Sequence, residues 1–263
     1  MKSAHSTDSR LSESVEIIET IGMGRNAYAS QDIGVGNLLA VDTGLTAHLN
    51  PDNKENTIRF CLYCLKNVDQ VPYPCSKCAR VIFCGPACQQ LAEGSYHKYQ
   101  CQLGIYNLRR KDTKDSFSMF NSLNTICSQP LKFWMDNQDK FLRPEGGGED
   151  WPSLVDTDVK KYNLLFQMVT HQDEEDKDKK ARNSIIMSFL LRCLRKTTYY
   201  QEGGVVIENN EKKLTKEEIV IGKIMYRLML INTMNAHPIW GVERSTKDRS
   251  EVGIENIGMQ HYI

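Results

Sequence analysis

The sequence lacks a segment that could span a membrane, and it lacks an excess of charge of either sign. Its longest apolar stretch, residues 219–231, is interrupted by Lys223 and Arg227, which is typical of a soluble helix. The 33 basic residues balance 33 acidic residues, whereas a large nucleic-acid footprint needs an excess of Lys and Arg on one face. We therefore expect neither membrane association nor direct nucleic-acid binding.

The sequence also begins without a secretory signal. Residues 1–13 are polar and contain no apolar core of the kind that a signal peptide requires. Nine cysteines in a chain with no export signal point to a reducing compartment, where thiolates bind metal ions instead of forming disulfides. We expect a soluble protein of the nucleus, the cytoplasm or both.

Seven of the nine cysteines and one histidine form four regularly spaced pairs. These pairs are Cys61 and Cys64, Cys75 and Cys78, Cys84 and Cys88, and His97 and Cys101. Zinc takes four such donors in a tetrahedron, so eight donors predict two closed sites, which are structural because no coordination position is open. A disulfide-linked module is the alternative, but seven cysteines cannot all pair with one another, and the histidine would have no role.

The spacing within each pair predicts how its two donors are carried. C-x2-C pairs fit tight turns, whereas residues i and i+4 share one face of a helix. Pro86 suits the first position of a helix that carries Cys88. Ser95 is predicted to be the N-cap of a second short helix that carries His97 and Cys101. The segment is therefore expected to be a metal-dependent unit with little core of its own.

All eight donor positions resemble those of a MYND zinc finger. The resemblance implies interleaved sites, with Cys61, Cys64, Cys84 and Cys88 around one zinc ion and Cys75, Cys78, His97 and Cys101 around the other. A RING-type ubiquitin ligase module is the competing interpretation, but it normally places a histidine in the middle of the donor order, and here the histidine is seventh of eight. MYND fingers recruit transcriptional regulators through short proline-containing peptides, so the resemblance implies protein partners of this kind.

The sequence on either side of the donors changes from strand-like to helical. Short strands are predicted at residues 15–18, 27–30 and 38–41, separated by glycine-containing turns, which suits an antiparallel meander. After the donors, we expect helices over residues 115–136, with Pro130 ending or kinking the first of them, and over 159–171 and 182–200. The charged run 172–180 is typical of a solvated loop or helix start, and the chain past Pro238 is predicted to be a loop.

Two of the predicted helices carry apolar stripes that we expect to be buried. In residues 182–200 the stripe is Ile185, Ile186, Phe189, Leu190, Cys193 and Leu194. Thr215 to Glu218 form a capping box that opens a further helix, with a predicted buried face of Ile221, Ile224, Met225, Leu228 and Ile231. Cys127 and Cys193 are expected to be small buried apolar residues and not metal donors.

Strands before the finger and helices after it resemble the SET-MYND family of protein-lysine methyltransferases. The resemblance rests on residues 22–39 and 235–239, and it implies that a MYND finger interrupts a SET domain. It further implies that Met23, Gly24, Arg25 and Asn235 contact the cofactor S-adenosylmethionine, and that histones or other proteins supply the substrate lysines. Tyrosine and backbone groups would then align the lysine with the methyl group.

The fold expected from this resemblance is α+β. It combines short strands of a split SET domain, a two-zinc MYND finger and a helical bundle. The expected boundaries are residues 14–60 for the first SET segment, 61–101 for the finger, 102–214 for a helical insert, and 215–263 for a helix and an incomplete SET core.

The sequence departs from the SET-MYND pattern in ways that bear on catalysis. No Asn-His-Ser triplet occurs, no cysteine follows Cys193, and neither His261 nor Tyr262 has the position of a catalytic residue in that family. We therefore assign no catalytic residue, and expect a fragment, a shortened product or a chain that a partner completes. The predicted function is protein interaction through the finger. The alternative is an active lysine methyltransferase, binding S-adenosylmethionine, once the SET domain is completed.

Overall fold

The structure is a computed structural model whose described part covers most of the finger and of the helical region. The described residues are 11–21, 24–41, 45, 47–49, 59–68, 71–104, 115–144, 158–207, 213–235, 237–244 and 252–260. The chain divides into two compact units, the first made of residues 1–44 and 262–263 and the second of residues 45–261. Among the helices described, none combines the length and the apolar character needed to cross a bilayer.

The first unit contains a β-hairpin. Strand β1 (Val15–Thr20) pairs antiparallel with β2 (Gly24–Ala29), so the first two predicted strands are confirmed with slightly different ends. The predicted strand at residues 38–41 is wrong, because in this segment only Ala40 forms an isolated bridge, to Leu11. An apolar pattern indicates a strand when one face is buried, but Leu38 and Val41 are both exposed.

The second unit contains a three-stranded sheet in the order β3-β7-β6. Strand β3 (Ala47–Leu49) and strand β6 (His237–Arg244) both pair antiparallel with β7 (Val252–Gln260). The prediction of a loop past Pro238 is therefore wrong. Strand pairing depends on neighbours far away in sequence, so local composition is a weak guide to it. One strand that precedes the finger thus shares a sheet with two strands that follow the helices.

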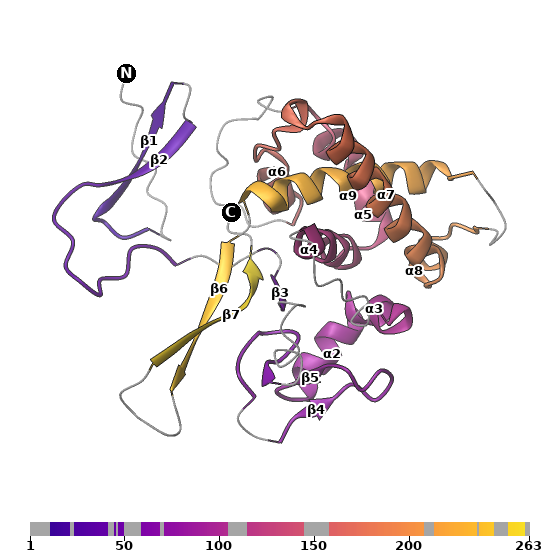
Figure 1. Ribbon diagram of the computed structural model, residues 1–263, viewed down its shortest axis with the longest axis horizontal. Helices are drawn as coiled ribbons and strands as arrows, with labels where there is room; N and C mark the ends of the chain where they lie inside the picture. Colours follow the sequence, from indigo (N-terminus) through magenta and orange to yellow (C-terminus); the bar gives the residue numbers. More distant parts are fainter. Residues whose placement is uncertain are drawn as a thin grey trace. The chain divides into compact units, whose positions relative to one another are not determined.

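Six helices of the second unit form a bundle (Figure 1). They are α4 (Asp115–Cys127), α5 (Leu131–Phe141), α6 (Asp158–Phe166), α7 (Lys177–Arg195), α8 (Tyr199–Glu202) and α9 (Lys216–Asn235), with a 3-10 turn, η2 (Gln172–Glu174), before α7. Helix α9 packs against α4, α5, α6 and α7, and its predicted apolar face is entirely buried. Aromatic side chains fill much of the core around Trp134, whose Nε1 donates to the carbonyl of Ile126 at 3.0 Å.

The helix boundaries follow the predicted breaks. Pro130 separates α4 from α5 and is the N-cap of α5, so the helix predicted over 115–136 is two helices. The helix predicted over 159–171 ends earlier, at Phe166. The capping box of α9 is confirmed. The Thr215 hydroxyl accepts from the Glu218 N–H at 3.3 Å, and the Glu218 carboxylate accepts from the Thr215 N–H at 2.9 Å.

The predicted buried stripe of α7 is confirmed at Leu190 and Leu194 and wrong at Ile185 and Phe189. Ile185 is 71% exposed and Phe189 is 41% exposed, whereas Asn183, Met187 and Leu191 are buried. Two further cysteine predictions differ in outcome, since Cys127 is buried and Cys193 is only partly buried. The buried face of α7 contains a polar residue, Asn183, and a search for apolar periodicity cannot anticipate such a position.

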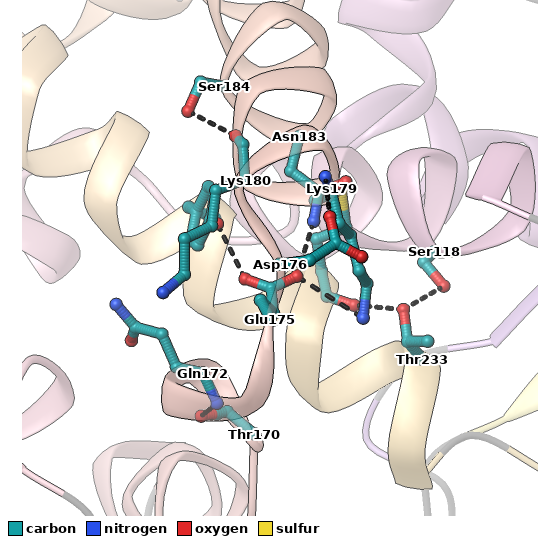
Figure 2. A network of polar contacts seen from close by, with 12 residues as sticks. Ser118, Thr170, Gln172, Glu175, Asp176, Lys179, Lys180, Asn183, Ser184 and Thr233 are labelled. Carbon is teal, nitrogen blue, oxygen red and sulfur yellow. Dashed lines mark hydrogen bonds and ion pairs between the residues drawn. The ribbon is translucent and has the colours of Figure 1, made fainter.

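Asn183 is buried because it belongs to a polar network around Glu175 (Figure 2). The side chain of Glu175 is only 1% exposed. It accepts hydrogen bonds from Asn183 Nδ2 at 2.9 Å and Tyr226 Oη at 2.8 Å, and it forms an ion pair with Lys179 Nζ at 3.4 Å. Three donors offset the cost of burying the carboxylate. The network ties the start of α7 to α9. The run 172–180 is mostly exposed and contains the start of α7, as predicted, but Glu175 within it is buried.

Candidate metal centre

The finger is built from two very short strands and two short helices around a small core. Strand β4 (Tyr73–Pro74) pairs with β5 (Ile82–Phe83), and α2 (Pro86–Gly94) and α3 (His97–Leu103) follow. The packed core of the finger contains, apart from cysteines, Leu49, Phe60, Leu62, Val81, Phe83 and Ala92, and Ile82 of β5 is also buried. So few apolar side chains supply little folding free energy, and small units of this kind depend on metal binding.

The two C-x2-C pairs lie on equivalent turns. The N–H of Leu65 donates to the carbonyl of Cys61, and the N–H of Ala79 donates to the carbonyl of Cys75, both at 2.9 Å. Leu65 and Ala79 each have a positive φ, 59° and 50° respectively. Such a left-handed residue reverses the chain four positions after the first cysteine. Both pairs are therefore carried by tight turns, as the spacing predicted.

The prediction that the other two pairs lie on helices is confirmed for Cys88, His97 and Cys101, whereas Cys84 lies two residues before α2. Helix α2 begins at Pro86 and carries Cys88, and α3 carries His97 and Cys101. The prediction that Ser95 is the N-cap of α3 is wrong. Ser95 ends α2 instead, where its hydroxyl donates to the carbonyl of Leu91 at 2.7 Å. Carbonyl groups in the last turn of a helix lack backbone N–H donors from the same helix, and the Ser95 hydroxyl supplies a hydrogen bond to one of them.

The eight donors gather into two groups of four. One group is Cys61, Cys64, Cys84 and Cys88, and the other is Cys75, Cys78, His97 and Cys101. Within each group all donor atoms lie within 4.8 Å of one another. The grouping joins the first pair with the third and the second with the fourth, which is the interleaved arrangement that the MYND resemblance implied.

The distances between donor atoms fit a tetrahedral zinc ion. Zn–S bonds of about 2.3 Å place the sulfurs of a tetrahedral site about 3.8 Å apart. The Sγ–Sγ distances are 3.7 Å from Cys64 to Cys84, 3.5 Å from Cys84 to Cys88 and 3.8 Å from Cys75 to Cys101. Cys78 Sγ lies 3.9 Å from His97 Nε2. The group of four thiols and the group of three thiols with one imidazole are therefore both consistent with zinc.

Backbone N–H groups favour one thiolate in each group. Burial acts to raise the pKa of Cys61, but N–H donors of Cys64, Cys84 and Tyr63 lower it overall. Burial likewise opposes ionisation of Cys75, and the N–H groups of Cys78 and Lys77 lower its pKa overall. The thiolate is the form that binds metal, so the first cysteine of each turn is prepared for coordination.

Cys64, Cys78, Cys88 and Cys101 are less readily ionised, because burial raises the pKa of each of them. Burial and the neighbouring sulfurs raise the pKa of Cys88, and they raise the pKa of Cys101 to about 12. Four sulfurs in one cluster repel one another as thiolates unless a cation offsets their charge. Burial lowers the pKa of His97 to about 4, so its imidazole is neutral at pH 7, as metal coordination requires.

The predicted cofactor residues are divided between the two units. Met23 lies outside the described residues, and Gly24 and Arg25 belong to β2 in the first unit. Asn235 ends α9 in the second unit, where its side-chain amide donates to the carbonyls of Ile231 and Val169, both at 3.0 Å. In the structure Asn235 therefore caps a helix end.

Sequence reasoning missed a polar and aromatic contact between the finger and the bundle. Glu202 of α8 accepts from Lys98 Nζ at 2.6 Å and from Tyr99 Oη at 2.7 Å. One signal was available in the sequence. Tyr99 lies two residues from His97 and from Cys101, which places it on the opposite face of α3 from both donors. An aromatic residue there indicates a second buried face.

Comparison with known proteins identifies the finger. Residues 61–101 match the family model described as MYND finger, and the matched range begins and ends on donor residues, Cys61 and Cys101. A comparison of the chain with curated proteins finds no match. The match and the two donor groups together establish a MYND finger with Cys and His zinc-binding groups at residues 61–101.

Proposed function

We propose that this protein is a zinc-dependent protein-interaction module of the nucleus or cytoplasm, whose MYND finger binds short proline-containing peptides of transcriptional regulators. The observation that carries the proposal is the pair of four-donor groups inside a matched MYND finger. MYND fingers mediate protein–protein interaction. A zinc ion with four protein donors has no open position for substrate, so its contribution is to hold the fold.

Exposed apolar side chains of the finger support peptide binding. Tyr63, Tyr73 and Leu91 are each at least 40% exposed. Proline-containing segments adopt an extended conformation before binding, and they dock on aromatic side chains at a low entropic cost. Tyr63 lies within the first turn and Tyr73 on β4, so the metal-held turns would also fix the position of these aromatic rings.

Zinc binding is tested by elemental analysis of the purified, reduced protein. We expect two zinc ions per chain. Cys75→Ala removes one of four donors and is expected to release about one ion, while Cys127→Ala, which alters a cysteine outside both groups, should keep two. Protein that contains no zinc, or whose finger cysteines are oxidised to disulfides, would contradict the proposal.

Peptide binding is tested with a library of labelled proline-containing peptides, each paired with a copy in which alanine replaces proline. We expect saturable binding that depends on proline and that falls about tenfold in Tyr73→Ala, the loss typical of one aromatic contact. Tyr28→Ala alters an exposed tyrosine of the first unit and serves as the matched control. Binding that survives removal of zinc, or that falls equally in both variants, would rule out the finger as the binding site.

A second candidate function is protein-lysine methylation, as a relative of the SET-MYND enzymes. One observation supports it. Strand β3 precedes the finger in the sequence and pairs with β7, which follows the bundle. The finger and the helices are therefore inserted, in sequence, between two strands that belong to one sheet. We propose that this arrangement descends from a SET domain that a finger interrupts.

The second candidate is tested by calorimetry with S-adenosylmethionine. We expect no saturable heat from this chain, since no Asn-His-Ser triplet occurs in it and the side-chain amide of Asn235 is engaged at the end of α9. Micromolar binding that Arg25→Ala abolishes would favour methylation over the interaction role. The variant Arg59→Ala, which alters an arginine outside the predicted cofactor contacts, serves as its control.

A further inference from the structure

Helix α3 contributes side chains both to the finger and to the core of the helical bundle. It supplies His97 and Cys101 to the second donor group. Between these donors, Tyr99 is 4% exposed and is part of the core of the helical bundle. No described residue between 59 and 94 belongs to that core. The first donor group is connected to it less directly, through Tyr96, which packs against both cores and whose hydroxyl donates to the carbonyl of Leu62 at 3.0 Å.

Several interactions fasten α3 to α8. The Tyr99 ring meets the Tyr199 ring edge-on, with centroids 5.2 Å apart, and the Tyr99 hydroxyl donates to Glu202. Lys98 Nζ pairs with the same carboxylate and lies 4.7 Å from the Tyr99 ring centroid. Thr198 donates to the other carboxylate oxygen of Glu202 at 2.6 Å. A carboxylate with three donors holds one geometry better than an isolated surface pair would.

The helix itself has few means of staying folded without these contacts. It is seven residues long, its N-cap residue Tyr96 makes no side-chain cap hydrogen bond, and its first turn contains no acidic residue. A helix of this length is unstable in isolation. Two metal donors four residues apart would hold it from one face, and the bundle holds it from the other.

We propose that α3 couples the second metal site to the helical bundle, so that zinc at Cys75, Cys78, His97 and Cys101 stabilises α8 more strongly than zinc at the first site does. The proposal rests on the proposed zinc binding but not on peptide recognition. Coupling between two sites is reciprocal. If bound zinc stabilises the contacts between α3 and α8 by some factor, these contacts must raise the zinc affinity of the second site by the same factor.

The first experiment measures zinc affinity by titration of the two-zinc protein with a coloured chelator. In Glu202→Gln, which alters no donor, we expect one of the two ions to be released at about tenfold lower chelator concentration and the other to be unchanged. Tyr99→Phe should act in the same direction. Asp136→Asn is the matched control, because it removes the carboxylate of the Lys132–Asp136 pair within α5.

The second experiment measures amide hydrogen exchange of residues 199–202 with and without zinc. In the unaltered protein, removal of zinc should speed this exchange about tenfold, and in Glu202→Gln the effect of zinc should largely disappear. If Glu202→Gln does not fold, Tyr99→Phe provides the same comparison.

The outcomes separate this inference from the proposal on which it rests. Protein that never holds zinc refutes the zinc-binding proposal. Two bound ions whose affinities are identical in the unaltered protein, Glu202→Gln and Tyr99→Phe refute the coupling alone. Exchange in α8 that does not respond to zinc in the unaltered protein refutes it as well.

Discussion

At the scale of single residues, the finger contains a backbone conformation that its sequence does not favour. Leu65 and Ala79 are left-handed without being glycine, which costs about 1 kcal/mol or more for an L-residue. Ala79 is exposed, whereas Leu65 packs against the finger core. The left-handed conformation of Ala79 is therefore imposed by its hydrogen bond to Cys75 and by the second donor group, and not by the intrinsic preference of alanine.

Replacing Ala79 with glycine should relieve this cost. We expect Ala79→Gly to raise the free energy of unfolding of the zinc-loaded finger by about 0.5 kcal/mol, because the gain in the turn exceeds the added entropy of the unfolded chain. Denaturant unfolding at constant free zinc measures the change. Leu65→Gly is the comparison, since the loss of its packed side chain should cancel the gain. A lower midpoint for Ala79→Gly would contradict the assignment of strain.

The hydrogen-bonded pair of Tyr226 and Glu175 gives stability a dependence on alkaline pH. Burial, and then the hydrogen bond to Glu175 and its charge, raise the pKa of Tyr226 to about 12 from an ordinary value of 10. A raised pKa in the folded state contributes stability that is complete below pH 10 and is lost as the pH rises through 12. Stability of the unaltered protein should therefore fall more steeply than that of Tyr226→Phe between pH 10 and 12.

Ultraviolet absorbance of tyrosinate follows the same titration directly. The spectrum of the unaltered protein minus that of Tyr226→Phe reports Tyr226 alone. We expect its ionisation at a lower pH in Glu175→Gln, since that change removes the neighbouring negative charge. An ordinary midpoint near pH 10 in the unaltered protein would mean that the Tyr226–Glu175 hydrogen bond does not form in solution.

At the scale of elements, the sequence predicts best where local chemistry decides. Pro86 and Pro130 mark helix starts and the capping box marks the start of α9, because caps and prolines act within a few residues. The donor spacing similarly predicts turns and helices, since a metal site needs fixed local geometry. The SET relation and the cofactor contacts are not tested by these local features and remain proposals.

The sequence predicts least where distant partners decide. Strands β6 and β7 form by pairing with each other and with β3, and the composition of residues 243–251 suggested a loop. The phase of α7 is set by the partners of Asn183, namely Glu175 and, through it, Tyr226. Likewise, the role of Lys98 depends on Glu202, which lies 104 residues away. None of these partners is visible in local periodicity.

The start of α9 offers a test at this scale. Thr215→Ala removes the hydroxyl that accepts from the Glu218 N–H, and the loss of such a cap typically costs about 1 kcal/mol. We expect a lower urea midpoint for the bundle with an unchanged slope. Lys216→Ala alters the neighbouring exposed residue, has no capping role and should be nearly neutral. Equal losses in both variants would show that the cap contributes nothing.

At the scale of the whole molecule, the two units differ in what holds them together. Among the described residues, every member of the bundle core and of the finger core lies at position 45 or later. The described part of the first unit contains a two-stranded hairpin, and Ile17, Ile21, Tyr28, Val35, Leu38, Leu39 and Val41 in it are exposed. An isolated two-stranded hairpin is at best marginally stable in water. The stability of the second unit should therefore owe little to the first.

A shortened chain of residues 45–261 tests this directly. We expect it to retain two zinc ions and the helical circular dichroism of the bundle, and to melt within a few degrees of the full chain, because it keeps both apolar cores and all eight donors. It should also bind the same proline-containing peptides, since Tyr63 and Tyr73 remain. Loss of zinc or of cooperative melting would mean that residues before 45 complete a core of the second unit. Loss of peptide binding alone would instead place part of the recognition surface on the first unit.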